Sequence, residues 1–290
     1  MHLIRFLRPA PGLEEYVRFY AQREGRLDGA TLVHPVPARA APILEFMFGD
    51  PCGVRRMGRS GIETSPRAVV VGMQTHRRIE LLIRGKPESF VIFFQPAGLH
   101  RLFSIPMDEL TDRDFEARAV LGPSISRLEQ RLSVCGSFAE RARITGDFLL
   151  RRSLTVASAD GVWAAASRIL LTSGQIRISA LAHSAGLSMR QFERKFIQQV
   201  GLPPKWYARI ARFEAALESK AKSIGKSWTD VAHESGYYDQ MHMVHDFEEF
   251  TGQTPTKTLN HVEMVFREQI EAMRSGDLSA NASGASRLIL

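Results

Sequence analysis

The sequence has little cysteine and no long apolar run. Its 290 residues include two cysteines, Cys52 and Cys135, and these fit no metal-ligand spacing. Thiols so few and so far apart exclude a disulfide-stapled secreted scaffold and favour a reducing compartment. No stretch reaches the ~18 apolar residues of a membrane span, and residues 1–9 are too short and interrupted for a signal peptide. We therefore expect a cytoplasmic protein with no membrane partner.

Motifs of common enzyme classes are missing as well. The sequence contains no glycine-rich phosphate loop, no nucleophile elbow and no His-Glu-x-x-His. A β-rich metal site could draw on His34, His76, His100, Glu45 and Glu80, but these residues show no His-x-His spacing. We predict no enzymatic activity, no cofactor and no metal. A metalloenzyme fused to a DNA-binding domain is the weakest alternative retained.

The net charge is +7 and the pI is about 9.7, which is compatible with a polyanionic partner. The charge is unevenly distributed. Residues 1–152 hold 23 Lys and Arg against 17 Asp and Glu, a net +6, whereas residues 158–262 hold 12 against 10, a net +2. Overall charge is therefore a weak argument for DNA binding, and local pattern has to supply a better one.

The patterning divides the chain into a β-rich part and a helical part. Short β-branched and aromatic runs punctuated by Gly and Pro predict strands at 31–34, 43–48, 68–72, 78–83 and 90–94. Helical spacing predicts helices at 13–22, 97–103, 123–132, 137–152, 203–217 and 261–274, followed by a polar tail at 275–286. We expect an α+β protein of two domains, residues 1–155 and 158–262, with an extra helix and tail over 263–290. Residues 153–159 form the expected linker.

An internal repeat lies in the helical part. Residues 181–186, Leu-Ala-His-Ser-Ala-Gly, recur at 231–236 as Val-Ala-His-Glu-Ser-Gly, and a second set of positions recurs 51 residues apart. Each copy predicts a short helix, a glycine turn and a second helix. Gly186 and Gly236 would supply positive φ. Ser188 and Ser227 would cap helices, with Gln191 completing a capping box.

This repeat resembles the DNA-binding domain of the AraC/XylS family of transcriptional regulators. The resemblance covers residues 160–260 and is carried by Gly186-Leu187-Ser188, Gly201-x-x-Pro204, Gly236-Tyr237-Tyr238-Asp239-Gln240 and Phe250-Thr251-Gly252-x-Thr254-Pro255. It implies two helix-turn-helix units joined by a long helix, 203–219, with each second helix in a major groove. The duplicated hairpin of a plain helical bundle is the alternative interpretation.

The N-terminal part is similar, less closely, to the cupin-like sensor domain of some members of that family. The stretches that carry this likeness include residues 42–51, 71–75, 93–99 and 103–110. We expect a barrel whose interior binds a small-molecule effector. Strand alternation puts Leu44, Phe46 and Phe48 on one face and Ile43, Glu45 and Met47 on the other, and it leaves open which face lines the interior. The candidate effector-binding residues are Ile43, Glu45, Met47, Leu81 and Phe93.

The two helix-turn-helix units differ in charge. Residues 178–212 carry six basic side chains against one acidic, a net +5, whereas residues 228–256 carry six acidic and no basic side chains, a net −6. We expect the first unit to dominate DNA binding, because acidic groups repel phosphates. The predicted DNA contacts are Ser188, Met189, Arg190, Gln191, Glu193 and Arg194 in the first unit and Gln240, Met241, His242, Val244 and His245 in the second. The opposite charges also suggest that the N-terminal domain docks on the second unit when DNA is absent.

The sequence thus predicts a sequence-specific DNA-binding transcriptional regulator with a sensor domain. Its expected partners are double-stranded DNA, a small-molecule effector and, for an activator, RNA polymerase. A homodimer stays open, as does the alternative in which the N-terminal domain only dimerises.

Overall fold

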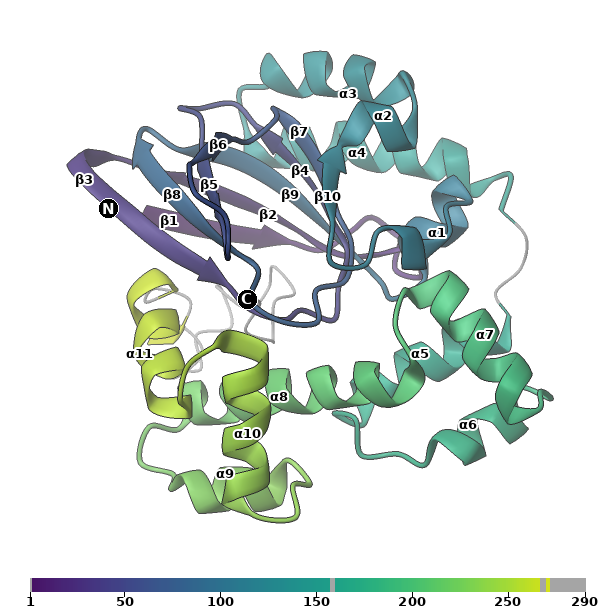
Figure 1. Cartoon of the computed structure of the whole chain (residues 1–290). Coiled ribbons are helices and arrows are strands. Elements are labelled where there is room, and N and C mark those ends of the chain that lie inside the picture. Colours follow the sequence, from purple (N-terminus) through teal and green to yellow (C-terminus); the bar gives the residue numbers. More distant parts are fainter. Residues whose placement is uncertain (1, 157–159, 267–269, 272–290) are drawn as a thin grey trace.

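The computed structural model describes residues 2–156, 160–266 and 270–271. A β-rich N-terminal part sits against a helical C-terminal part (Figure 1). The strands are β1 His2–Leu7, β2 Val17–Gly25, β3 Leu27–Val36, β4 Ile43–Met47, β5 Gly53–Arg56, β6 Glu63–Thr64, β7 Ala68–Val71, β8 Ile79–Gly85, β9 Glu88–Phe94 and β10 Asp114–Glu116.

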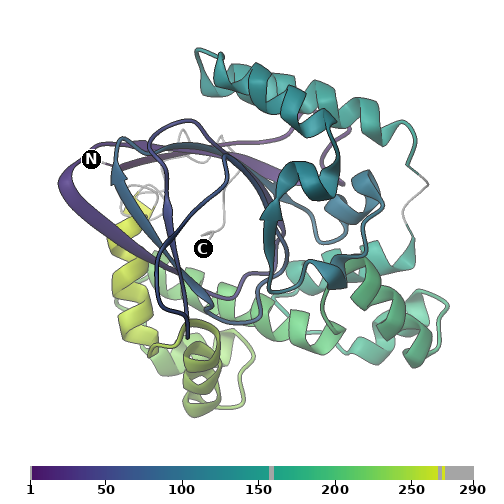
Figure 2. The ribbon, with the colours of Figure 1, turned by 45° about the horizontal axis from the view of Figure 1, so that its top comes forward.

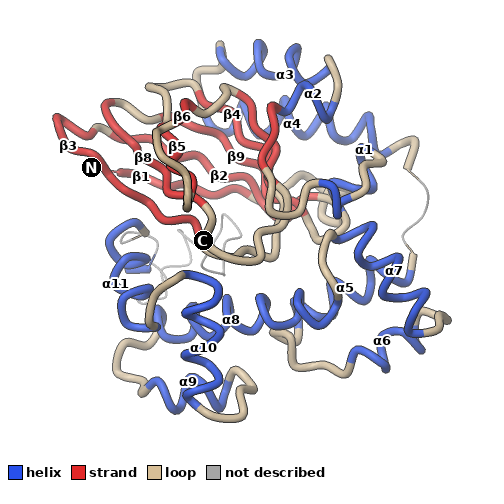
Figure 3. Tube along the Cα trace, viewed as in Figure 1, coloured by secondary structure: helices blue, strands red, loops and turns tan. Residues whose placement is uncertain are grey.

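The strands form two antiparallel sheets that enclose a common interior (Figure 2). Six strands pair in the order β1-β2-β9-β4-β7-β10, and four pair in the order β3-β8-β5-β6. This is the expected barrel of the cupin type, and the five predicted strands all appear in it (Figure 3).

Helices follow the strands in the N-terminal part. They are α1 Gly98–Phe103, the short η1 Met107–Glu109, α2 Ala117–Leu121, α3 Ser124–Ser133 and α4 Phe138–Ser153. Leu44 and Phe46 share one buried apolar cluster with residues of α3 and α4, among them Leu128 and Phe138. The opposite face of β4 therefore turns to the barrel interior, which answers the question that alternation left open.

The helix predicted at residues 13–22 is wrong, because residues 17–25 form β2. This strand lies between β1 and β9 and is covered on both faces. Phe19 and Ala21 belong to the interior cluster, whereas Val17 and Tyr20 pack with the helices. A strand that is buried on both faces loses its apolar-polar alternation and shows an apolar spacing that also fits a helix.

The C-terminal part is all helical. It contains α5 Gly161–Leu171, α6 Ile178–Ser184, α7 Met189–Val200, α8 Pro204–Lys222, α9 Trp228–Glu234, α10 Gln240–Thr251 and α11 Pro255–Val265. The predicted helix at 261–274 begins six residues earlier, at Pro255, which occupies the first turn after Thr254. Its end, the predicted tail at 275–286 and part of the predicted linker lie outside the described residues.

The N-terminal part contacts both halves of the helical part. Ala38, Ala40 and Met73 belong to the core cluster of the C-terminal helices. The Ala38 amide donates to the Phe250 carbonyl at 3.0 Å, and the Thr111 hydroxyl donates to the Gly201 carbonyl at 2.6 Å. Docking is thus not confined to the acidic second unit, and these contacts are apolar packing and hydrogen bonds to backbone carbonyls.

Two histidines meet at this junction. His34 of β3 is 4% exposed, and its Nδ1 lies 3.1 Å from Nε2 of half-buried His261 on α11, with the rings stacked. Burial, together with the nearby charge of Arg77, lowers the pKa of His261. The folded chain therefore favours the neutral His261 imidazole.

We predict that this junction loses stability in mild acid. A depressed folded-state pKa contributes stability that is complete above the unfolded histidine pKa of about 6.5 and is lost as the pH falls below it. Thermal unfolding at pH 7.5 and 5.5 should show a smaller loss in midpoint for His261→Gln than for the unmodified chain. His245→Gln, on an exposed side chain of α10, is the control and should behave like the unmodified chain. Equal losses in all three proteins would contradict the prediction.

Candidate nucleic-acid interface

The first helix-turn-helix unit consists of α6 and α7. Gly186, with φ +65°, makes the turn between them. Ser188 caps α7 by accepting from the Gln191 amide, and Gln191 Oε1 accepts from the Ser188 amide, which completes the predicted capping box. Phe192 and Phe196 are fully buried. The opposite face of α7 is thereby held outward.

That outward face carries the predicted contacts of the first unit. Ser188, Met189, Arg190, Gln191 and Arg194 are exposed, and Glu193 is half-buried. Arg190 and Arg194 stand one turn apart, and among the described residues neither forms an ion pair with Glu193. Both guanidiniums are available for the bidentate pairing that arginine makes with a guanine edge.

The second unit, α9 and α10, repeats the geometry. Gly236 makes its turn with φ +73°, and Ser227 and Asp239 cap α9 and α10. The predicted contacts Gln240, Met241, His242 and His245 are exposed, and Val244 is half-buried. Gln240 Oε1 accepts from the Thr229 hydroxyl at 2.8 Å, which orients that amide.

The acidity of the second unit is partly neutralised from α8. Arg209 Nη2 lies 2.5 Å from Asp246 Oδ1 and 2.5 Å from Glu249 Oε2, and the Asp246 side chain is 1% exposed. Lys226 pairs with Glu234 at 2.5 Å. When these two cations are counted with the six carboxylates of residues 228–256, the net charge of the second unit changes from −6 to −4. Without Arg209, the net charge of the first unit changes from +5 to +4.

Helix α8 sets the separation of the units (Figure 1). It spans 19 residues, about 28 Å at ~1.5 Å per residue. Neighbouring major-groove segments on one face of a duplex are about 34 Å apart. The length of α8 is thus comparable with the spacing of consecutive major-groove segments.

Tyr238 is a candidate contact that sequence reasoning missed. It lies in the turn before α10 and is 87% exposed, next to Met241 at 71%. An exposed aromatic beside a recognition helix can pack on sugars or thymine methyls. Tyr238 was missed because it follows the buried Tyr237, and the sequence alone does not indicate which of the two tyrosines faces outward.

The barrel interior contains two adjoining cavities that share Arg23, Glu45, Ser65 and Leu81. Ile43 lines the first and Met47 the second. Phe93, 2% exposed, packs with Ile43 in the apolar cluster on the same side of the sheet. Four of the five candidate effector residues thus line the cavities, whereas Phe93 lines neither and packs beside them. Arg39 and Gln74, which line the first cavity, were missed because they lie between strands.

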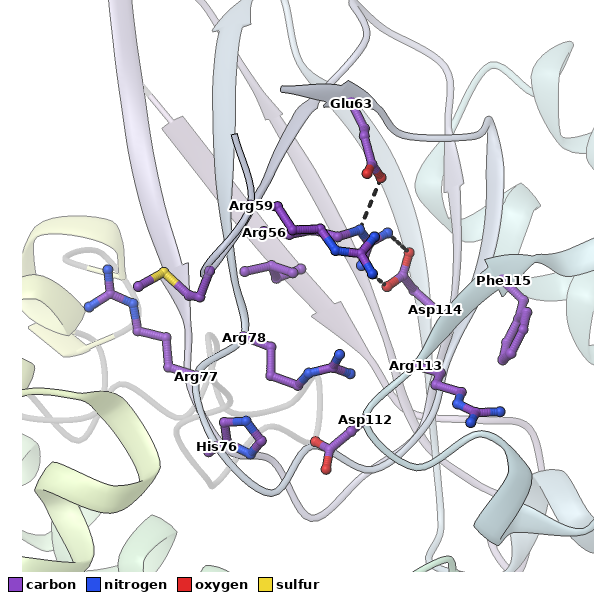
Figure 4. Close-up of a pocket in the computed structure, with 12 residues that line it drawn as sticks. Arg56, Arg59, Glu63, His76, Arg77, Arg78, Asp112, Arg113, Asp114 and Phe115 are labelled. Atoms are coloured by element: carbon purple, nitrogen blue, oxygen red, sulfur yellow. Dashed lines mark hydrogen bonds and ion pairs between the residues drawn. The ribbon is translucent and has the colours of Figure 1, made fainter. Parts of the chain in front are cut away.

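An open cleft lies between β5, β8 and β10 and shares Ile79 and Asp114 with the first cavity (Figure 4). Five arginines line it, Arg56, Arg59, Arg77, Arg78 and Arg113, together with three carboxylates. Arg56 crosses the cleft and donates two hydrogen bonds of 2.7 Å to Asp114. Hydrogen bonding to Asp114 raises the pKa of Arg56. Arg78 extends into the same space below that pair (Figure 4).

The histidines weighed for a metal site have other partners. His34 stacks on His261, His76 contacts the Thr75 hydroxyl, and His100 contacts the Ile105 carbonyl. Within residues 2–156, 160–266 and 270–271, no group of three His, Cys, Asp or Glu side chains could hold a metal ion. Over the same residues, no helix combines the length and apolarity needed to cross a membrane.

Comparison with protein families decides the nature of the C-terminal part. Residues 181–261, from within α6 to within α11, match a family described as a helix-turn-helix domain. This part of the chain is a helix-turn-helix domain of the AraC type, and the protein is a DNA-binding transcriptional regulator. Residues 5–116 of this regulator match a second family, described as a domain of unknown function (DUF6597), which covers the barrel strands. A search of curated proteins returned no match.

Among solved structures, the regulator is similar to ToxT from Vibrio cholerae, with 10% identity, a TM-score of 0.45, and coverage of 90% of this chain and 97% of that chain. It is also similar to ToxT with a bound unsaturated fatty acid (10% identity, TM-score 0.44, 89% and 94% coverage). The AraC-like transcriptional activator CuxR shows 12% identity and a TM-score of 0.23, with 71% and 84% coverage.

We predict that the Arg209–Asp246 pair stabilises the second unit through its buried carboxylate. Arg209→Ala leaves Asp246 unpaired and should cost about 2–3 kcal/mol in free energy of unfolding. Asp246→Asn in the Arg209→Ala background removes the charge and should recover part of that loss, a coupling that urea unfolding of the four proteins of the cycle measures. If the double variant is as unstable as the two single losses added together, the pair is uncoupled and the prediction is wrong.

Proposed function

We propose that the regulator reads a specific duplex site with both helix-turn-helix units and that a small molecule in the N-terminal barrel sets its DNA affinity. The observation that carries the DNA part is the outward pair Arg190 and Arg194, presented opposite the fully buried Phe192 and Phe196. The exposed N-terminal turn of a second helix is the part that reaches base edges in such motifs.

The proposed division of labour follows the sequence-based bounds. Residues 1–155 sense and residues 158–262 bind DNA, and residues 263–290 belong to neither domain. We propose that the regulator has no catalytic activity and acts in the cytoplasm at the chromosome. Contact with RNA polymerase, for an activator, and pairing of two copies through the N-terminal part belong to the same proposal.

The docked arrangement leaves the DNA-facing side chains free. Both α7 and α10 end against the N-terminal part, at Gly201 and Phe250, whereas the caps at their other ends, Ser188 and Asp239, are exposed. The N-terminal part can therefore adjust the relative placement of the units without covering their DNA-contacting ends.

We predict that the first unit contributes more to DNA affinity than the second. A bound operator fragment should be selected from a random duplex pool with the full chain and then titrated in mobility shifts. Arg190→Ala or Arg194→Ala should each raise the dissociation constant by an amount worth about 1–3 kcal/mol and relax base preference at one position.

Arg168→Ala, on an exposed side chain of α5, is the matched control and should change affinity little. Gln240→Ala combined with His245→Ala should weaken binding less than Arg194→Ala alone. The reverse order would refute the ranking. Equal affinity for selected and scrambled duplexes would refute sequence-specific binding itself.

A further inference from the structure

Two buried polar groups in the first barrel cavity lack a protein partner. Arg39 and Gln74 are each 4% exposed and both line this cavity. Arg39 Nη2 and Gln74 Oε1 have no hydrogen-bond partner within the described structure. An unmade hydrogen bond on a buried group costs about 1–3 kcal/mol, so such groups usually bind water or a ligand.

The charge around the cavity favours an anion. Arg23 and Arg39 line it against Glu45, while the second carboxylate, Asp114, is held by Arg56. Arg23 Nη1 lies 4.0 Å from Glu45 Oε1, and the Arg39 Nε donates to the Ala41 carbonyl. Burial, together with the charge of Arg23, lowers the pKa of Arg39 to about 10, although Glu45 and Glu214 act in the opposite direction. The guanidinium charge of Arg39 is therefore incompletely compensated.

The available space limits the size of the ligand. Each of the two adjoining cavities has about 50 Å³ of room. A water needs about 10–15 Å³ measured in this way, so each cavity holds roughly three to five waters. Two joined cavities suit a molecule of about six to ten heavy atoms.

Resting on the proposed sensing function, we propose that the barrel interior binds a small hydroxycarboxylate whose carboxylate accepts from Arg39 and whose hydroxyl donates to Gln74. Arg39 supplies a donor without an acceptor, and Gln74 supplies an acceptor without a donor. A hydroxycarboxylate provides the complementary pair and one negative charge.

The same two segments reach the DNA-binding part. Arg39 and Gln74 are joined by reciprocal backbone hydrogen bonds of 2.9 and 3.2 Å. Their chain neighbours Ala38, Ala40 and Met73 are buried in the core of the C-terminal helices. The Ala40 amide donates to Glu214 of α8 at 2.9 Å, and the Tyr207 hydroxyl of α8 donates to the Ala40 carbonyl at 3.4 Å. A ligand that repositions Arg39 thus acts on the helix that joins the two units.

The test uses the full chain with lactate and with propionate, which lacks the hydroxyl, each against sodium chloride at equal ionic strength. Lactate should raise the thermal midpoint saturably, because binding to the native state stabilises it. Arg39→Met, of similar length, should abolish the shift. Gln74→Leu should weaken lactate about tenfold and remove the preference for lactate over propionate.

Arg78→Ala, in the open cleft, is the matched control and should leave lactate binding unchanged. No shift with either acid, an equal shift in Arg39→Met, or loss of the shift in Arg78→Ala would each overturn the proposal. Should Arg39→Met not fold, the lactate preference of Gln74→Leu decides.

A DNA titration with and without saturating lactate separates this inference from the function beneath it. Lactate should change DNA affinity at least fivefold. Normal specific DNA binding without any lactate effect would overturn the coupling alone, whereas absence of specific DNA binding would overturn the proposed function.

Discussion

The structure depends on helix α8, which serves three neighbours at once. Phe213 packs edge-on against Phe247 and Phe250 of the second unit, and Tyr207 packs against Phe196 of the first. Glu214 and Tyr207 also hold the N-terminal segment around Ala40. A helix that is buried on several sides cannot rotate or slide without disturbing each partner, because packed interiors yield in discrete steps. Both recognition helices are therefore positioned by one element.

The charge of the second unit follows from the same helix. Its carboxylates appear repulsive to DNA when they are counted along the sequence, but Asp246 turns inward and binds Arg209 of α8. Arg209 also stacks on Trp206, with its guanidinium carbon 4.6 Å from the ring centroid. Arg209, which its sequence position assigns to the first unit, thus stabilises the second unit. Arg190 and Arg194 remain the exposed cations at the DNA-facing end of α7, so the asymmetry between the units persists in a milder form.

Sequence patterns predicted what depends on local chemistry. The capping box of Ser188, the glycine turns and the amphipathic face of Phe192 and Phe196 each involve residues within a few positions, and all appear as expected. Strand β2 was mistaken for a helix because its pairing with β1 and β9 bridges distant segments. Arg39 and Gln74 were missed for a related reason, since their burial results from two loops that pair with each other beyond the ends of the neighbouring strands β4 and β7. Periodicity carries no information on where a loop residue between strands will point.

The position of these two loops bears on how sensing can reach DNA. The side chains of Arg39 and Gln74 face the cavity, while adjacent backbone and alanine side chains fill the helical core, so the two environments are separated by single residues. No hinge or long-range pathway is required for a change at one to alter the other. Small residues such as Ala38 and Ala40 permit the close approach, and a displacement of their backbone would strain its hydrogen bonds to Phe250 and Glu214. Those partners lie at the end of α10 and in the middle of α8. The displacement would therefore change the angle between the two units rather than unfold either one. Because a duplex site fits the two units at one angle, this change would alter the affinity for DNA.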